Sequence, residues 1–364
     1  MFRISQFMEE IARPTPLGPV RSPPGPVVIW NLVRRCNLTC KHCYSISADK
    51  DFPGELSTPE VFAVMDQLKA FRVPALILSG GEPLLRPDIF DISSRAKAMG
   101  FFTALSSNGT LIDEAMCARI RAIGYDYVGV SLDGLGATHD KFRRMEGAFD
   151  LSLAGIRRCR DAGLKVGVRF TMTQDNFQDL PGLLQLVEQE GIDRFYFSHL
   201  NYAGRGNKNR MDDARHQMTR AAMDLLFDTC WEYRQRGLHK EFTTGNNDAD
   251  GVYLLFWLLR KFPDKVAHIR AKLEQWGGNS SGEAIRAGST SPTSTTSATS
   301  IPTPCGGTTH WATCASVPSA KSGTTCPIRC WPASRRGRVP SAGAAEAART
   351  SPSAAATRGY VPSS

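Results

Sequence analysis

The sequence predicts an α/β protein built as a partial (β/α)6 TIM-like barrel, followed by a helical extension and a disordered C-terminal tail. Between residues 27 and 199, apolar runs of strand length alternate with segments that repeat apolar residues at helical spacing. This alternation is typical of a parallel sheet wrapped by helices. Polar motifs directly follow several strands, at the edge where barrel enzymes carry their sites, which favours a full or partial barrel over an open sheet.

The expected elements follow one another in a regular order. Residues 1–26 form an N-terminal lead-in, whose Pro- and Gly-rich second half is expected to be irregular. The first barrel helix is expected after Ser57, because Ser57 and Glu60 have the spacing of a capping box. Strands are expected at 27–33, 75–79, 101–105, 127–131, 165–171 and 194–199, and further helices at 87–99, 112–123, 149–162 and 180–189.

The remaining chain divides into two regions. The core barrel is expected to span 27–212, and an apolar-rich helical extension, interrupted by a loop at 243–248, follows over 213–282. Residues 283–364 contain no Leu, Phe, Met, Asp, Asn or Gln. Such a segment cannot bury enough apolar surface to order itself, which predicts a disordered low-complexity tail. A sharper hypothesis is that the reading frame is lost near Gly282, because out-of-frame translation of GC-rich sequence produces this bias.

Charge and apolar runs narrow the class of protein. The formal net charge is +9, but the tail contributes +6 of it, so the main body is nearly balanced and no nucleic-acid partner is expected. The N-terminus has Glu9 and Glu10 where a signal peptide needs apolar residues, and the longest apolar run, at 252–259, is too short to span a membrane. A cytoplasmic protein without a membrane partner is therefore expected. In that compartment, clustered cysteines indicate metal or redox chemistry.

The strongest chemical signal is a group of three cysteines directly after the first predicted strand. Cys36, Cys40 and Cys43 have the spacing C-x3-C-x2-C. A short loop with this spacing can present three thiolates to one [4Fe–4S] cluster and leave one iron open for a ligand. The alternative is a zinc site with His42 as the fourth ligand. His42 stands between two of the cysteines, where its ring can hardly turn onto the same metal.

Further motifs follow the later strands in order. Ser79-Gly80-Gly81-Glu82-Pro83 ends the second strand, Asn108-Gly109 follows the third, and Ser131-Leu132-Asp133-Gly134 ends the fourth. With Tyr44 after the third cysteine, this set resembles the signature of the radical S-adenosylmethionine (SAM) superfamily. The resemblance implies a [4Fe–4S] cluster on the three cysteines and cleavage of SAM to a 5′-deoxyadenosyl radical. It also implies SAM contacts at Tyr44, Gly80, Gly81, Glu82, Pro83, Asn108, Ser131, Asp133 and Arg143, the last with the SAM carboxylate.

Other residues near the strand ends are open between two interpretations. His199 is either a core histidine or a site residue, and Gly204 and Gly206 resemble the glycines that the superfamily places near adenine. Cys117 and Cys159 fall within predicted helices and are expected to be small buried residues.

Segments outside the superfamily motifs resemble one particular family of radical SAM proteins. The lead-in, the segment 243–253 and the sequence at 277–282 are similar to the family of radical SAM proteins of haem d1 biosynthesis (the NirJ family). This implies a tetrapyrrole substrate, 12,18-didecarboxysirohaem, whose propionates at C3 and C8 are removed and replaced by oxo groups. It also implies an electron donor such as flavodoxin or ferredoxin. By charge alone, Arg169, Arg205 and Arg210 are candidates to hold the substrate carboxylates, and the favoured alternative for each is a solvated surface charge.

One departure from that family concerns its second iron–sulfur cluster. The family carries a C-terminal cysteine-rich region with closely spaced cysteines, whereas the tail has Cys305, Cys314, Cys326 and Cys330 at unrelated spacing. The auxiliary cluster is therefore expected to be absent from this chain. Two alternatives stay open: a radical SAM enzyme that modifies a ribosomal peptide, and a non-catalytic iron–sulfur or zinc protein.

Overall fold

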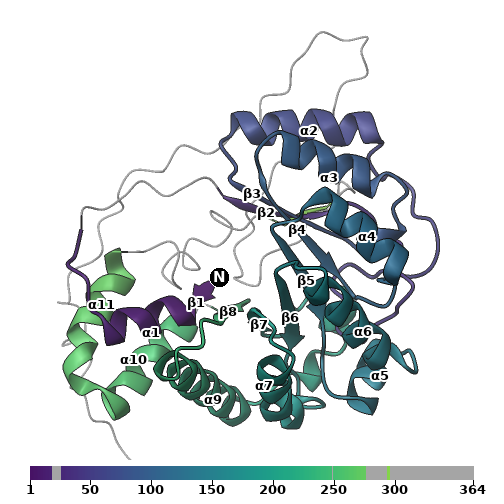
Figure 1. Ribbon diagram of the computed structural model, residues 1–364. Coiled ribbons are helices and arrows are strands. Elements are labelled where there is room, and N and C mark those ends of the chain that lie inside the picture. Colours follow the sequence, from purple (N-terminus) through teal and green to yellow (C-terminus); the bar gives the residue numbers. More distant parts are fainter. Residues whose placement is uncertain (19–25, 248, 276–292, 296–364) are drawn as a thin grey trace, which may run out of the picture. The chain divides into compact units, whose positions relative to one another are not determined.

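A curved sheet of parallel strands, ordered as in the sequence, forms the centre of the fold (Figure 1). The computed structural model describes residues 1–18, 26–247, 249–275 and 293–295. The first and last parallel strands of the barrel are not paired with each other, so the barrel is partial, as predicted. These strands are β2 (Val27–Asn31), β3 (Ala75–Ser79), β4 (Phe102–Ser107), β5 (Tyr127–Ser131), β6 (Val166–Thr171), β7 (Arg194–Ser198) and β8 (Glu241–Gly245).

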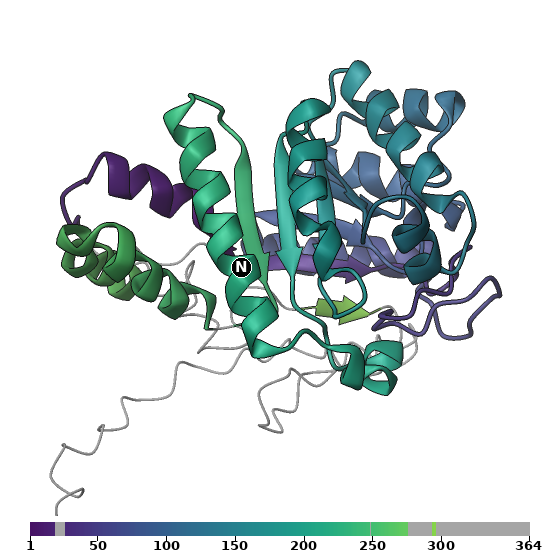
Figure 2. The same ribbon diagram turned by 90° about the horizontal axis from the view of Figure 1, so that it is seen from below.

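Helices connect the strands and lie outside the curved sheet (Figures 1 and 2). The expected alternation is confirmed, and the capping box is present, with the Ser57 backbone N–H donating to Glu60 at 2.8 Å. The barrel helices are α2 (Thr58–Ala70), α3 (Ile89–Ala98), α4 (Glu114–Ile123), α5 (Ala137–Arg143), α6 (Ala148–Asp161) and α7 (Leu180–Gln189).

The seventh parallel strand, β8, corrects the prediction of a loop at 243–248. Glu241–Gly245 pairs in parallel with β7 along its whole length. The segment is short, and Phe242 is its only large apolar residue, so it lacks the apolar run that marks the other strands. Its place in the sheet extends the barrel by one strand and brings residues after 245 to the same edge as the other strand ends.

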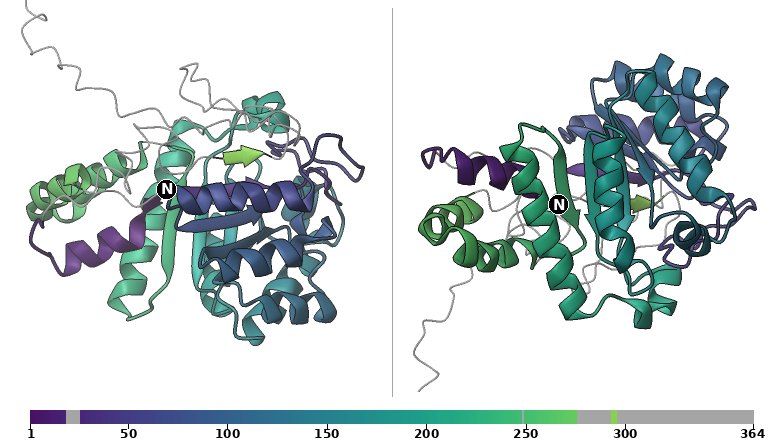
Figure 3. Two further views of the ribbon diagram at one scale, coloured as in Figure 1. Left: turned by 90° about the horizontal axis from the view of Figure 1, so that it is seen from above. Right: turned by 60° about the horizontal axis from the view of Figure 1, so that its bottom comes forward.

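Short strands extend both edges of the sheet. β1 (Phe2–Arg3) pairs antiparallel with β8, and β9 (Thr293–Thr295) pairs parallel with β2 (Figure 3). The pairing of β9 corrects the prediction of disorder for these three residues, because an open strand edge offers unpaired backbone groups to any extended segment. The rest of the 283–364 prediction lies outside the described residues.

The short α8 (Gly204–Lys208) precedes the predicted helical extension. Within 213–275 the structure has α9 (His216–Gln235), α10 (Asp250–Lys261) and α11 (Val266–Gln275), with the strand β8 between α9 and α10. The lead-in adds a helix that was not predicted, α1 (Ile4–Ala12), which buries Phe7 and Met8 and packs against α9 and α11 (Figure 3). Among these residues, no helix is both long and apolar enough to cross a bilayer.

Candidate active site

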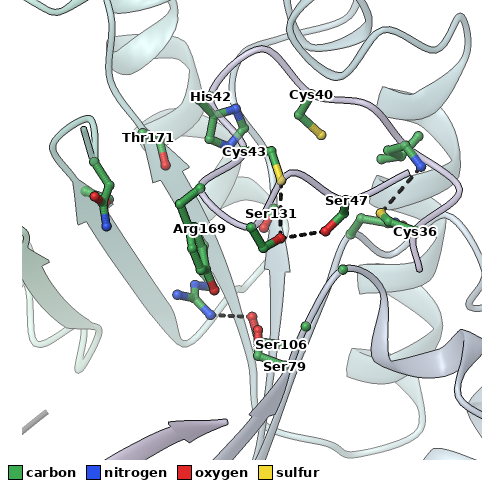
Figure 4. A pocket seen from close by; sticks show the side chains of 18 of the residues that line it. Cys36, Cys40, His42, Cys43, Ser47, Ser79, Ser106, Ser131, Arg169 and Thr171 are labelled. Atoms are coloured by element: carbon green, nitrogen blue, oxygen red, sulfur yellow. Dashed lines mark hydrogen bonds between the residues drawn. The ribbon is translucent and has the colours of Figure 1, made fainter. Parts of the chain in front are cut away.

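A cavity of about 200 Å³ lies at the carboxyl edge of the sheet, beneath the loop that follows β2 (Figure 4). Because the strands are parallel, the motifs at their ends converge there. The predicted site residues that line the cavity are Cys36, Cys40, Cys43, Tyr44, Gly80, Gly81, Asn108, Ser131 and Arg143. The other three, Glu82, Pro83 and Asp133, are buried outside its lining.

The three cysteines lie together on one side of the cavity (Figure 4). Cys36 and Cys40 are each 6% exposed and Cys43 is partly buried, and all three are free thiols. In a cubane each cysteine binds a different iron, so three thiolates at one wall of a cavity fit a [4Fe–4S] cluster. The residues present therefore fit the predicted cluster.

Each of the three thiols has a polar side-chain neighbour from a different part of the chain. The Asn108 Nδ2 donates to Cys36 Sγ at 3.8 Å, and the Arg143 Nη1 donates to Cys40 Sγ at 3.5 Å. The hydroxyl of Ser45 shares a hydrogen bond with Cys43 Sγ at 3.4 Å. Such contacts to sulfur set the reduction potential of an iron–sulfur cluster, and they hold the ligands in place.

Burial sets the proton affinity of these thiols. Burial raises the pKa of Cys36 to about 12 and also raises the pKa of Cys40, where the Arg143 charge opposes it. Burial would raise the pKa of Cys43 as well, but hydrogen bonds with Ser45 and the Ser47 backbone lower it overall. Cys36 and Cys40 are therefore protonated in the metal-free protein at neutral pH, and cluster binding releases their protons.

The zinc alternative receives no support from His42. Its Nε2 lies 3.5 Å from a carboxylate oxygen of Asp133, and its ring stacks on Phe142 at 4.6 Å between centroids. Burial lowers the pKa of His42 to about 4, so the ring is neutral. In the part of the chain that the structure describes, His42 and the three cysteines do not form a group that could share a single metal ion, as a zinc site requires.

The Gly80-Gly81 turn packs directly on the chain that leads into the cysteine loop. The Gly81 N–H donates to the Val33 carbonyl at 2.6 Å, and the Glu82 N–H donates to the Arg35 carbonyl at 2.9 Å. A Cβ on Gly81 would lie 2.3 Å from the Arg35 carbonyl oxygen. The absence of a side chain at this turn lets two backbone segments approach each other.

Gly81→Ala is expected to lower the free energy of unfolding of the metal-free protein by about 1–3 kcal/mol, because the added methyl group overlaps the Arg35 carbonyl. Urea unfolding followed by circular dichroism measures this. Gly18→Ala, where a Cβ would meet nothing within 4 Å and the backbone is not left-handed, is a control for added volume alone. Equal losses in both variants would contradict the close-packing argument.

Glu82 lies behind the cavity wall and organises the loop after β4. Its carboxylate accepts hydrogen bonds from the Asn108 N–H at 2.7 Å, the Ser107 hydroxyl at 2.9 Å and the Leu84 N–H at 3.2 Å. It is fully buried and does not line the cavity. In this structure Glu82 therefore positions Asn108, which itself reaches Cys36.

Glu82 is expected to make the stability of the metal-free protein depend on pH. Burial raises its pKa from 4.5 to about 7, against the lowering effect of its three hydrogen bonds. The folded state thus holds this proton more tightly than the unfolded state, and stability falls as pH rises from 4.5 through 7. The shift corresponds to roughly 3 kcal/mol at most.

The free energy of unfolding, measured from about pH 5 to pH 7.5, checks this expectation. Burial lowers the pKa of His42 and of His139 to about 4, so their contribution to stability rises over the same pH range, and the effect of Glu82 is measured as a difference between variants. The stability of Glu82→Gln relative to the unaltered protein should increase with pH, whereas Glu60→Gln, which alters an exposed capping residue, should show no such change. The same pH dependence in Glu82→Gln and the unaltered protein would contradict the role given to Glu82.

Asp133 anchors the arginine that was predicted to bind the SAM carboxylate. The Arg143 Nη2 lies 2.5 Å from an Asp133 oxygen, and the Thr171 N–H donates to the other oxygen at 2.7 Å. Burial would raise the pKa of Asp133, but the charge of Arg143 lowers it overall, so this carboxylate is ionised. Asp133 therefore holds Arg143 between itself and Cys40, at the edge of the cavity.

Comparison with known proteins decides the family. The model of the radical SAM superfamily matches residues 30–187. The pre-heme d1 synthase of Dinoroseobacter shibae is 54% identical over 287 residues, which cover 78% of this chain and 71% of that protein. The chain belongs to the radical SAM superfamily. The Fe-coproporphyrin III synthase of Methanosarcina barkeri is 44% identical over 71% of this chain and 65% of its own length.

Solved radical SAM structures share the fold. Streptococcus suis SuiB bound to S-adenosylmethionine has a TM-score of 0.52 at 17% identity, over 61% of this chain. The match spans about half of SuiB, 51% of its length. At this identity the likeness concerns the fold alone, and it agrees with the partial barrel described above.

The glycines and one arginine after β7 support the radical SAM cysteine loop from outside. A Cβ on Gly204 would lie 2.4 Å from the Tyr44 carbonyl oxygen, and one on Gly206 would lie 3.1 Å from the His42 carbonyl oxygen. The Arg205 guanidinium donates to the carbonyls of Cys40 at 2.7 Å and Ser47 at 2.8 Å. Arg205 was a candidate for substrate carboxylates; its guanidinium instead binds the loop backbone.

One residue that supports the radical SAM cavity, Asp250, was not predicted from the sequence. His199 lines the cavity, and its Nε2 lies 3.0 Å from the Oδ1 of Asp250, which is 1% exposed. Asp250 begins α10, and it also accepts a hydrogen bond from Thr244 at 2.5 Å. The acidic residue at the start of a predicted helix was a signal, but its proximity to His199 depends on the unpredicted strand β8. Arg210, also a candidate, does not line the cavity.

Proposed function

We propose that this chain is a radical SAM enzyme of haem d1 biosynthesis that acts on 12,18-didecarboxysirohaem. In this proposal, propionate side chains at C3 and C8 are removed by radical chemistry and replaced by oxo groups. The observation that carries it is the 54% identity to a pre-heme d1 synthase over 71% of that protein. A second relative, 44% identical, is named for the synthesis of another iron tetrapyrrole, which supports the same substrate class.

The cavity supports the cofactors of this proposal. Cys36, Cys40 and Cys43 would hold the [4Fe–4S] cluster, and Arg143 would pair with the carboxylate of SAM through its guanidinium. When bound, the cluster and SAM supply a 5′-deoxyadenosyl radical, which can take hydrogen from the saturated carbon of a propionate. The chain's own residues orient the two reactants and keep water out, which is the protein's part in such chemistry.

Three finer points belong to the same proposal. We propose an electron donor of the flavodoxin or ferredoxin kind and a cytoplasmic location, on the ground that reduced, clustered cysteines fit that compartment. We also propose that the cluster on Cys36, Cys40 and Cys43 is the one cluster bound, because the cysteines after residue 300 do not repeat the family's spacing. The likeness to SuiB is one of fold and does not favour a peptide substrate.

The experiment combines two products in one assay. The protein is reconstituted anaerobically with iron and sulfide, then reduced and incubated with SAM and 12,18-didecarboxysirohaem. Formation of 5′-deoxyadenosine together with loss of propionate mass from the tetrapyrrole would support the proposal. Formation of 5′-deoxyadenosine with an unchanged tetrapyrrole would reject the substrate and keep the enzyme class, whereas a protein that binds no iron would reject both.

A further inference from the structure

The cavity is cationic on its protein side. Among the described residues that line it there are two arginines, Arg143 and Arg169, and no Asp or Glu. The charge of Arg143 is offset by the buried Asp133 at 2.5 Å. Arg169 differs in this respect, since the described part of the chain places no carboxylate within ion-pair distance of its guanidinium.

The contacts of Arg169 are with neutral groups. Its Nη1 donates to the hydroxyl of Ser106, and its guanidinium carbon lies 5.1 Å from the centroid of the Tyr196 ring (Figure 4). Burial raises the pKa of Tyr196 and, to about 12, the pKa of Tyr127. These phenols are therefore protonated at neutral pH, and they leave the positive charge of Arg169 uncompensated.

An uncompensated guanidinium in a half-buried position is costly in the ligand-free protein. Its planar fork matches a carboxylate, which can accept two parallel hydrogen bonds from it. Arg205 does not line the cavity, and two of its three guanidinium nitrogens donate to the carbonyls of Cys40 and Ser47.

We propose that Arg169 is a carboxylate-binding residue of this cavity. The carboxylate belongs either to SAM or to a side chain of the tetrapyrrole; both present the same chemistry, and the second source rests on the proposed function. Arg169 is held by other partners than Arg143, which pairs with Asp133, so the cavity offers two separately supported guanidinium groups.

The test compares matched ligands on matched variants of the reconstituted protein. SAM is compared with decarboxylated SAM, and 12,18-didecarboxysirohaem with its methyl ester, each by equilibrium titration. In the unaltered protein, removing or masking the relevant carboxylate should weaken binding about 10- to 100-fold, the range for a hydrogen-bonded charge pair. In Arg169→Gln the preference for the acid over its neutral counterpart should shrink about 10-fold or more in one of the two ligand pairs, because one partner of the carboxylate is gone. In the SAM pair, any preference that remains is due to Arg143.

The source of the carboxylate is identified by the ligand pair in which Arg169→Gln reduces the preference for the acid. A reduced preference for SAM over decarboxylated SAM assigns Arg169 to SAM, and this comparison needs no tetrapyrrole. A reduced preference for the tetrapyrrole acid over its ester assigns Arg169 to the substrate. If the unaltered protein binds no tetrapyrrole, the proposed function fails while the SAM arm still tests Arg169.

Two controls keep a structural role apart from a binding role. Arg169→Lys retains the charge without the fork and should keep part of the acid preference. Arg157→Gln, on the surface in a pair with Glu190, should leave both ligand pairs unchanged. Iron content and circular dichroism establish that each variant is folded and loaded. If Arg169→Gln binds the cluster and retains the full preference for the acid in both ligand pairs, the proposal is wrong. If Arg169→Gln does not bind the cluster, Arg169→Lys is compared instead, and the full preference for the acid in both ligand pairs in that variant would overturn the proposal.

Discussion

Cys40→Ala is expected to abolish cluster binding and to lower the formation of 5′-deoxyadenosine from SAM by at least about 100-fold. Cys40 is buried at the cavity wall and receives a hydrogen bond from Arg143 at 3.5 Å. Removing this thiol leaves two protein ligands, and it also leaves the Arg143 fork without its sulfur acceptor. Iron content after anaerobic reconstitution and product formation by chromatography measure the two effects.

The matched control for this prediction is a buried cysteine outside the cavity. Cys159, on α6, is fully buried, and it lies close enough to Cys117 on α4 for the two thiols to interact. Cys159→Ala should keep the cluster and the activity, because this thiol only fills space between helices. Retention of a full cluster in Cys40→Ala, or its loss in Cys159→Ala, would contradict the assignment of the ligands.

Asp133→Asn is expected to be the most destabilising single change at the site, with a loss of about 3–5 kcal/mol in the free energy of unfolding. Asp133 is fully buried and offsets the charge of Arg143, which is 7% exposed. Without it, Arg143 carries an unpaired buried charge. Its guanidinium also loses the contact that aims it at Cys40, so the affinity for SAM should fall as well.

Denaturant unfolding of the metal-free protein measures the free energy of unfolding, and titration of the reconstituted protein measures the affinity for SAM. Asp126→Asn is a matched control, because Asp126 also pairs with a cation, Lys97, and also accepts a backbone N–H, but is one-third exposed. Its loss should stay below about 2 kcal/mol, without an effect on SAM. Comparable losses in the two variants would show that burial of the Asp133 pair is not decisive.

The sequence predicted well those features that repeat along the chain. The apolar runs of β2 to β7 located six strands, and the motifs at their ends located most of the cavity lining, because parallel strands bring their carboxyl ends together. The strand β8 was missed because Glu241–Gly245 has one large apolar residue. The packing of α1 against distant helices was missed because it depends on tertiary contacts.

The roles of individual side chains were harder to predict than their location. Glu82 was predicted to contact SAM, and the structure adds that its carboxylate accepts hydrogen bonds from Asn108, Ser107 and Leu84 behind the cavity wall. Arg169 and Arg205 are alike in sequence terms, as basic residues near strand ends. Only the structure shows that Arg205 binds backbone carbonyls and that Arg169 has neutral partners.

The most direct test of the central claim is electron paramagnetic resonance of the reduced, reconstituted protein with and without SAM. The claim is that Cys36, Cys40 and Cys43, which line the cavity, would hold a [4Fe–4S] cluster with one iron left open for SAM. The spectrum should therefore show a [4Fe–4S] cluster, and SAM should change it by binding to the open iron. A cluster spectrum that SAM leaves unaltered, or a protein that forms no cluster at all, would contradict this account.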